Sequence, residues 1–353
     1  MTTREQQFTE LFPSEPSYRF KQIEQAFFDP KNTGWQDIST LPQTMLEQLT
    51  EMVPWMSVEE FRMYESKLGD TYKAILKTQD GKLFETVLME NKRGDYTICV
   101  SSQIGCAMRC TFCATGTMGL KRSLTSDEII DQYRFWKYFL LNQSSNLPPT
   151  TYHLQPTRIS NIVFMGMGEP LANYDNVKKA IHTWLKYTDL GPTHITVSSV
   201  GILTQLEKIL EDKDWPHVRI AISLHSANQS RREEIVPTTV PEFLSKLADW
   251  SHRYHKILGN RRHYITYEYT ALAGINDTPE LAEELASYIL KTASSKINII
   301  PYNPVPGKPF DRSDKERIER FKTILRNHGL DVTQRRTMGD DIAAACGQLV
   351  TEL

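Results

Sequence analysis

Three of the chain's five cysteines lie within eight residues, as Cys106-x-x-x-Cys110-x-x-Cys113. Cysteine thiolates bind soft metals, chiefly zinc and iron–sulfur clusters. A structural zinc site takes four ligands, and no fourth Cys or His stands at a usual zinc-ligand spacing from the triplet. A [4Fe–4S] cluster has four iron atoms, so three thiolates would leave one iron open to a reactive ligand. We therefore expect a [4Fe–4S] cluster here, with a zinc site as the alternative.

The two remaining cysteines differ in their sequence surroundings. Cys99 stands seven residues before the triplet, at the end of an apolar run, where a free cysteine often serves as a small hydrophobic side chain. Cys346 lies among alanines and just before Gly347, which is typical of a loop that must approach a substrate closely. A thiolate is a good methyl acceptor when its pKa is lowered. Cys346 is therefore a candidate nucleophile.

Composition places the chain among soluble globular proteins. Of its 353 residues, 40% are hydrophobic and 24% are charged, and no stretch reaches the apolar length of a membrane span. The first residues show no apolar signal region, and the odd cysteine count argues against a disulfide scaffold, so we expect a monomer in the reducing cytoplasm. The net charge of −2 does not favour nucleic acid, so RNA contacts must come from local patches.

The positions of the apolar residues predict the order of secondary structure. Residues 1–70 read as helical, and residues 71–96 as a β-hairpin around Asp80-Gly81. From residue 97 onwards, strand and helix patterns alternate. The predicted strands are 97–101, 159–165, 194–198, 218–224, 264–272 and 296–301. The predicted helices between them include 126–141, 174–187, 241–254 and 279–292.

Six alternating units predict an α/β protein with a parallel sheet closed only in part, a (β/α)6 partial barrel. We divide the chain into a helical accessory domain (1–70), a hairpin extension (71–96), the barrel (97–335) and a segment that carries Cys346 (336–353). Ser144–Pro156, rich in Ser, Pro and Thr, reads as an inserted loop. Barrel enzymes place their chemistry at the C-terminal ends of the strands.

Several polar residues follow the predicted strands and would meet at that end of the barrel. Gly168 permits close backbone approach to a ligand, and the Glu169 carboxylate could accept a hydrogen bond from a cationic amino group. Ser198, Ser223 and Asn303 suit the hydroxyls and base edge of a nucleoside, although loop capping explains them too. His225 fits either a ligand contact or a bond to a neighbouring strand.

Together these residues resemble the radical S-adenosylmethionine (SAM) enzymes that methylate C2 of adenosine in 23S rRNA and tRNA. The cysteine spacing is the signature of radical SAM enzymes, and five blocks in order are similar to this family, from about Ser17 to Leu349. The blocks are Ser-Ser-Gln-x-Gly-Cys, Phe-Met-Gly-Met-Gly-Glu-Pro-Leu, Ile-Ser-Leu-His, Pro-Tyr-Asn-Pro-x-Pro-Gly and Arg-Arg-Thr-x-Gly-Asp-Asp-Ile-x-Ala-Ala-Cys-Gly-Gln-Leu.

The resemblance implies a role for each candidate residue. Cys346 matches the cysteine that is methylated, Cys99 its partner thiol, and Glu85 a proton acceptor. The cluster ligands would be Cys106, Cys110 and Cys113. The SAM contacts would be Gly168, Glu169, Ser198, Ser223, Leu224, His225 and Asn303.

The resemblance also implies a mechanism with two SAM molecules per turnover. One methylates Cys346, and the other yields a 5′-deoxyadenosyl radical that removes hydrogen from the S-methyl group. The resulting carbon radical adds to C2, the C2 proton leaves to Glu85 or Cys99, and Cys99 then displaces the product as a Cys99–Cys346 disulfide forms. An external electron donor and a disulfide reductant complete the cycle.

Two departures and two rival functions remain. Glu234-Ile-Val-Pro-Thr-Thr replaces the family's usual Met-Pro stretch after Ser-Leu-His, and the 144–156 insertion is additional. Both bear on the choice of RNA. The rivals are C8-methylation of the same rRNA adenosine, as in the sister class that confers antibiotic resistance, and a non-catalytic RNA-binding protein with a structural metal.

Overall fold

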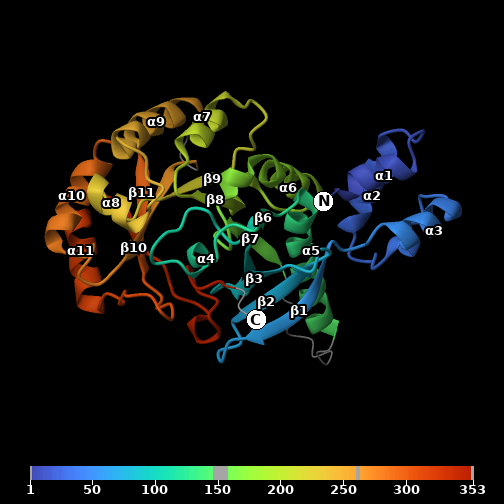
Figure 1. Ribbon diagram of the computed structural model, residues 1–353, viewed down its shortest axis with the longest axis horizontal. Helices are drawn as coiled ribbons and strands as arrows, with labels where there is room; N and C mark the ends of the chain where they lie inside the picture. The colour runs from blue at the N-terminus through green and yellow to red at the C-terminus, as the bar shows by residue number, and fades with distance from the viewer. Residues whose placement is uncertain (1, 146–157, 260–262, 351–353) are drawn as a thin grey trace.

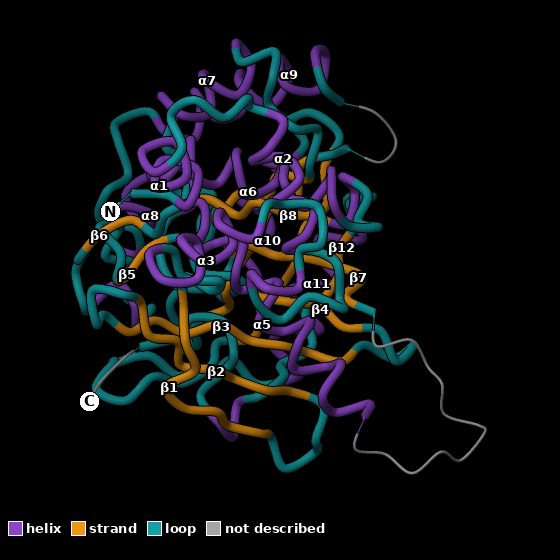
Figure 2. Tube along the Cα trace, turned by 90° about the vertical axis from the view of Figure 1, so that its right-hand side faces the viewer, coloured by secondary structure: helices purple, strands orange, loops and turns teal. Residues whose placement is uncertain are grey.

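The computed structural model describes residues 2–145, 158–259 and 263–350, and a ten-stranded sheet runs through most of this part of the chain (Figures 1 and 2). Strands β1 to β4 are antiparallel, and the strands from β4 to β12 are parallel. In spatial order the strands are β1 (Val58–Glu65), β2 (Thr71–Thr78), β3 (Leu83–Glu90), β4 (Tyr96–Cys99), β7 (Ile159–Phe164), β8 (Ile195–Ser199), β9 (Arg219–Ser223), β10 (Ile265–Ala271), β11 (Ser295–Pro301) and β12 (Val332–Gln334).

The parallel half confirms the predicted α/β partial barrel. Each of the six predicted strands is present within two residues of its predicted ends, and helices connect one strand to the next. A seventh parallel strand, β12, was not predicted. The connecting helices are α5 (Ser126–Ser145), α6 (Tyr174–Tyr187), α7 (Leu203–Glu211), α9 (Phe243–Ile257), α10 (Pro279–Ile289) and α11 (Lys315–Asn327), with the short α8 (Gln229–Ile235) before α9.

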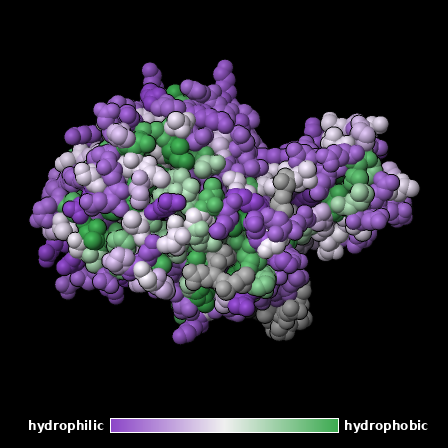
Figure 3. All heavy atoms as spheres, viewed as in Figure 1, coloured by the Kyte–Doolittle hydropathy of each residue, from purple (hydrophilic) through white to green (hydrophobic). Residues whose placement is uncertain are grey.

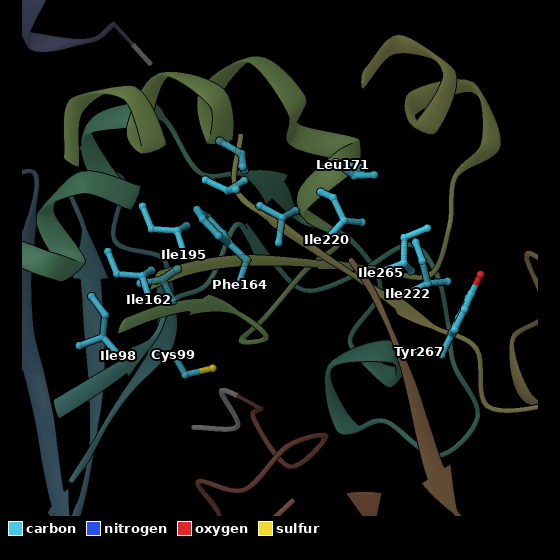
Figure 4. Close-up of a cluster of buried hydrophobic side chains, with 14 of the residues drawn as sticks. Ile98, Cys99, Ile162, Phe164, Leu171, Ile195, Ile220, Ile222, Ile265 and Tyr267 are labelled. Carbon is cyan, nitrogen blue, oxygen red and sulfur yellow. The ribbon is translucent and has the colours of Figure 1, made fainter. Parts of the chain in front are cut away.

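Apolar side chains at helical spacing hold these helices against the sheet. In α6, Val177, Ile181 and Trp184 are buried, and they recur every three or four residues, which places them on one face. Ile162, Phe164, Ile195 and Ile220 from the strands meet this layer (Figure 4). The main core therefore lies between the sheet and its outer helices.

The N-terminal helices form a smaller core of their own at the edge of the molecule (Figures 1 and 3). They are α1 (Arg4–Leu11), α2 (Tyr18–Phe27) and α3 (Gln43–Met52). Arg4 ties this unit to the barrel, because its buried guanidinium pairs with Asp131 of α5 at 3.0 Å. Arg134 of α5 also pairs with Asp131, at 2.6 Å.

The prediction of helix up to residue 70 is wrong for β1. Only Val58 of its eight residues is buried, because β1 is an edge strand that leaves most of its side chains in solvent. Such a strand shows little of the alternation between apolar and polar residues that identifies strands in a sequence.

The predicted hairpin is confirmed as β2 and β3, with a tight turn in which Gly81 has a φ of 77°. The hairpin is part of the barrel's sheet, since β3 pairs with β4 and brings Val87 opposite Cys99. Smaller elements are β5 (Gln103–Ile104), β6 (Arg122–Ser123) and α4 (Ala114–Thr117). The predicted 144–156 insertion lies, apart from the end of α5, outside the described residues. None of the described helices has the length and apolar character needed to cross a membrane.

A candidate active site at the barrel mouth

A cavity of about 150 Å³ opens at the C-terminal ends of the parallel strands. All three cysteines of the triplet line it, together with Cys346 and most of the predicted SAM contacts. The predicted residues along its wall are Cys106, Cys110, Cys113, Gly168, Glu169, Ser198, Ser223, His225, Asn303 and Cys346. The structure thus brings together segments that are more than 200 residues apart in the sequence.

The cysteine triplet lies on the loop between β5 and α4. Arg109 has a φ of 53° within this loop, and Gly116 packs against the Cys110 backbone, where an added Cβ would lie 3.0 Å from the carbonyl oxygen. Burial raises the pKa of Cys106 to about 12 and raises the pKa of Cys110 as well. Buried thiols of this kind become ligands when a metal replaces their protons.

The donor set fits a cluster. Cys106, Cys110 and Cys113 line one cavity from a single loop. A [4Fe–4S] cluster takes one thiolate at each iron that the protein holds, so three thiols on one wall suit three of its irons. No group of three His, Cys, Asp or Glu side chains that could hold a single metal ion is found in the described part of the chain.

The loop after β7 has its conformation because two glycines leave room for the chain that follows β4. Gly168 has a φ of 98°, and an added Cβ would lie 2.5 Å from the Gln103 side chain. At Gly166 an added Cβ would lie 2.7 Å from the Ser101 hydroxyl. The sequence predicted close approach to a ligand, and the structure shows close approach to the protein itself.

Glu169 places a buried carboxylate at the cavity. It accepts N–H bonds from Leu171 at 3.0 Å and from Val200 at 2.9 Å. Burial raises the pKa of Glu169, and these hydrogen bonds oppose that shift. The carboxylate is therefore held in place by the main chain, in reach of a cationic group that enters the cavity.

His225 and its neighbours form the wall at the ends of β9 and β10. The Thr270 N–H donates to Nδ1 of His225 at 3.1 Å, and the ring meets Phe112 edge-on. Burial and the Arg232 charge lower the pKa of His225 to about 3, so the imidazole is neutral. Leu224 does not line the cavity, because its side chain is in the main core.

Cys99 and Cys346 share a second, smaller cavity of about 30 Å³ with Arg335. Burial raises the pKa of Cys99 to about 12, the nearby Cys346 adds to this shift, and Arg335 opposes it. Cys346 in turn raises the pKa of Arg335. Figure 4 shows the Cys99 side chain on the opposite side of the strands from Phe164 and Ile195.

Glu85 lines neither cavity. Its buried carboxylate pairs with Lys73 at 3.1 Å and accepts the Val350 N–H at 3.0 Å. Burial raises the pKa of Glu85, and Lys73 opposes that shift.

Arg335 and Glu268 are charged residues of the site that were not predicted from the sequence. Arg335 lines both cavities, and Glu268 lines the larger one, where its carboxylate accepts a bond from Asn298 at 2.9 Å. Glu268 is a charged residue within an apolar strand, a signal that could have identified it. Arg335 entered the sequence analysis only as the first residue of the block Arg-Arg-Thr-x-Gly-Asp-Asp, with no role of its own.

Comparison with a solved structure defines the class of protein. The crystal structure of a radical SAM methyltransferase from Sphaerobacter thermophilus matches with a TM-score of 0.84 and 33% identity, over 98% of this chain and 96% of that one. No protein-family model matches. The fold is that of a radical SAM methyltransferase, and membership of this class implies a [4Fe–4S] cluster and SAM.

Sequence relatives narrow the class to a family. A probable dual-specificity RNA methyltransferase RlmN from Aquifex aeolicus is 38% identical over 98% of this chain and 94% of its own length. The dual-specificity RNA methyltransferase RlmN of Lawsonia intracellularis is 37% identical over 96% and 91%. A ribosomal RNA large subunit methyltransferase N from Nitrosopumilus maritimus is 39% identical over 90% and 88%. The chain belongs to the RlmN family of RNA methyltransferases.

Proposed function

We propose that this chain methylates C2 of adenosine in 23S rRNA and tRNA, and that Cys346 carries the methyl group to the RNA. One observation carries this proposal: Cys346 lines the same cavity as the cysteine triplet and also shares a cavity with Cys99. The proposed methyl acceptor thus lines both cavities, with the proposed cluster ligands in the larger one and the proposed partner thiol in the smaller one.

The bound groups would supply the radical chemistry, which the protein directs by geometry and by exclusion of water. Cys106, Cys110 and Cys113 would hold the cluster. The SAM would be held by Glu169, Ser198, Ser223, His225, Asn303 and the main chain at Gly168, whereas Leu224 does not line the cavity. Two SAM molecules per product and an outside electron donor belong to this proposal.

The two thiols act in turn. Cys346 accepts a methyl group. After its methylene carbon has bonded to C2, and the adduct has given up the C2 proton and the one electron that the outside donor had supplied, Cys346 remains joined to the RNA as a thioether. The Cys99 thiolate then attacks the Cys346 sulfur, and the carbon–sulfur bond breaks with its electron pair on the methylene carbon. That carbon takes up a proton and becomes the methyl group, while an external thiol reduces the Cys99–Cys346 disulfide. The C2 proton goes to Glu85 or to Cys99.

Glu85 has to change partners before it accepts that proton. Its carboxylate is engaged by Lys73 and by the Val350 N–H, so the C-terminal segment has to shift first. Cys99 is the better placed of the two, although burial disfavours its thiolate.

Anaerobic reconstitution tests the proposal. The purified chain, supplied with iron and sulfide, is incubated with SAM, a reductant and transcripts of 23S rRNA or tRNA, and the nucleosides are analysed by mass spectrometry. We expect about four irons per chain, release of 5′-deoxyadenosine and 2-methyladenosine in both RNAs. 8-Methyladenosine would assign the chain to the sister reaction. One zinc per chain without product would indicate a binding protein.

A further inference from the structure

A buried ion pair joins two strands of the hairpin beneath the segment that carries Cys346. Lys73 of β2 and Glu85 of β3 lie diagonally across the pair of strands, since Ile75 is the residue opposite Glu85. Nζ of Lys73 is 3.1 Å from Oε1 of Glu85, and the two side chains are only 9% and 2% exposed. A pair this deep is stable only while its remaining donors and acceptors are satisfied.

Both members of the pair bond to the C-terminal segment, one on each side of Cys346. Lys73 Nζ donates to the Ala343 carbonyl at 3.2 Å, three residues before the cysteine. The Val350 N–H donates to the other Glu85 oxygen at 3.0 Å, four residues after it. The Lys73–Glu85 pair therefore holds the segment on both sides of Cys346, and these two contacts form a bracket around residues 343–350.

Other contacts hold the middle of this segment to the barrel. Asn303 donates to the Cys346 carbonyl at 3.1 Å, and the Ala114 N–H, next to the cluster cysteine Cys113, donates to the Gly347 carbonyl at 2.8 Å. The hairpin thus fixes the two ends of the bracketed stretch, while the barrel fixes its centre.

We propose that Lys73 is a positioning residue which, through Glu85 and Ala343, holds the segment so that Cys346 faces the barrel mouth for methylation. The proposal rests on the proposed function of Cys346. Lys73 itself contacts no reacting atom. Without its charge, the Glu85 carboxylate is buried without compensation, becomes protonated more readily and accepts the Val350 N–H less well.

The test compares four variants by two readouts. Lys73→Met removes the charge and keeps the length, Lys73→Arg restores a charged donor, and Lys73→Met/Glu85→Gln leaves a neutral pair that still accepts the Val350 N–H. The control is Lys77→Met. Lys77 lies on the same strand as Lys73, and the substitution breaks an exposed ion pair with Glu59 of β1. One readout is hydrogen exchange of the 339–350 peptide in the cluster-free protein. The other is the methylated fraction of Cys346 after reconstitution with SAM.

We expect faster exchange of this peptide in Lys73→Met and about a tenfold drop in the rate of Cys346 methylation, the factor that a lost hydrogen bond to a charged group produces. Lys73→Arg and the double variant should recover most of both losses, and Lys77→Met should match the wild type. A general loss of stability would instead speed hydrogen exchange throughout the sheet and not mainly in the 339–350 peptide.

Wild-type exchange and methylation in Lys73→Met would overturn the proposal. If Lys73→Met does not fold, the test rests on Lys73→Arg and the double variant. The proposal is also overturned if neither of these variants slows hydrogen exchange of the 339–350 peptide to the wild-type rate. If the wild-type chain never methylates Cys346 yet the exchange differences appear, the proposed function fails and the bracket stands as a structural feature.

Discussion

Cys99 and Cys346 come close together from two regions of very different construction. Cys99 ends β4, which is hydrogen-bonded to β3 on one side and to β7 on the other. Cys346 lies in a segment between the left-handed residues Ala343 and Gly347, with φ values of 50° and 85°. A ladder of backbone bonds on both sides fixes the first thiol, whereas a few individual contacts hold the second.

The difference matches the work that the proposed reaction asks of each thiol. Cys346 has to accept a methyl group at one place and deliver it at another, so its segment needs contacts that can open at low free-energy cost. Cys99 attacks only after the thioether has formed, so it can stay at one position, and its place at the end of β4 holds it there. Four substitutions test whether the two thiols differ in this way.

Loss of the Cys346 thiol should have the largest effect. Cys346→Ala removes the methyl acceptor, so we expect no methylated enzyme and no methylated RNA, while iron content after reconstitution stays at the wild-type level. Intact-protein mass spectrometry and nucleoside analysis measure both. Appearance of 2-methyladenosine with this variant would show that the RNA is methylated without Cys346.

Loss of the fixed thiol should stop the reaction later. In Cys99→Ala the methyl group still reaches Cys346 and the RNA, but the thioether cannot be resolved. We expect a covalent protein–RNA adduct in denaturing gels and little free product. Rapid turnover by this variant would remove Cys99 from the mechanism.

Arg335 lies beside both Cys99 and Cys346, and its charge makes the reaction between the two thiols depend on pH. Burial raises the pKa of Cys99 to about 12, so its thiolate fraction and the rate of Cys99–Cys346 disulfide formation should rise about tenfold per pH unit below that value. Arg335 opposes the shift, so Arg335→Leu should slow disulfide formation by roughly tenfold at pH 8. The rate is measured over a pH series on protein whose Cys346 has first been converted to a mixed disulfide by oxidised glutathione, so that Cys99 displaces glutathione as it attacks Cys346, and mass spectrometry of the alkylated protein follows the product. An unchanged rate would contradict a role for Arg335.

The smallest effect should come from a substitution at Gly168, in the loop that follows β7, and it should be an effect on stability. Gly168→Ala adds a Cβ 2.5 Å from Gln103 at a φ of 98°, which should lower the free energy of unfolding by about 1–3 kcal/mol. Gly307→Ala is the control, because its φ is 76° but no atom lies within 4 Å of the added Cβ. Denaturant unfolding of both variants separates the clash from the backbone strain, and equal losses would exclude the clash.

The barrel could be predicted because its strands are buried on both faces and read as apolar runs, and because the cysteine spacing is local. Edge strand β1 and the three-residue β12 carry too little pattern to be recognised. The bracket of Lys73 and Glu85 could not be predicted, since it depends on contacts across more than 260 residues. For Glu85, the resemblance implied a proton acceptor, whereas the structure shows an occupied carboxylate.

The unbroken sheet has a consequence for how this enzyme would choose its target. Three strand-to-strand steps separate β1 from β4, which corresponds to about 14 Å at the usual spacing. Backbone hydrogen bonds join each strand to the next, so the distance between β1 and β4 is fixed. If an RNA binds along β1, only nucleotides that can span this distance will reach the site beside Cys99. The shape of the RNA would then limit which substrates react, before any base is recognised.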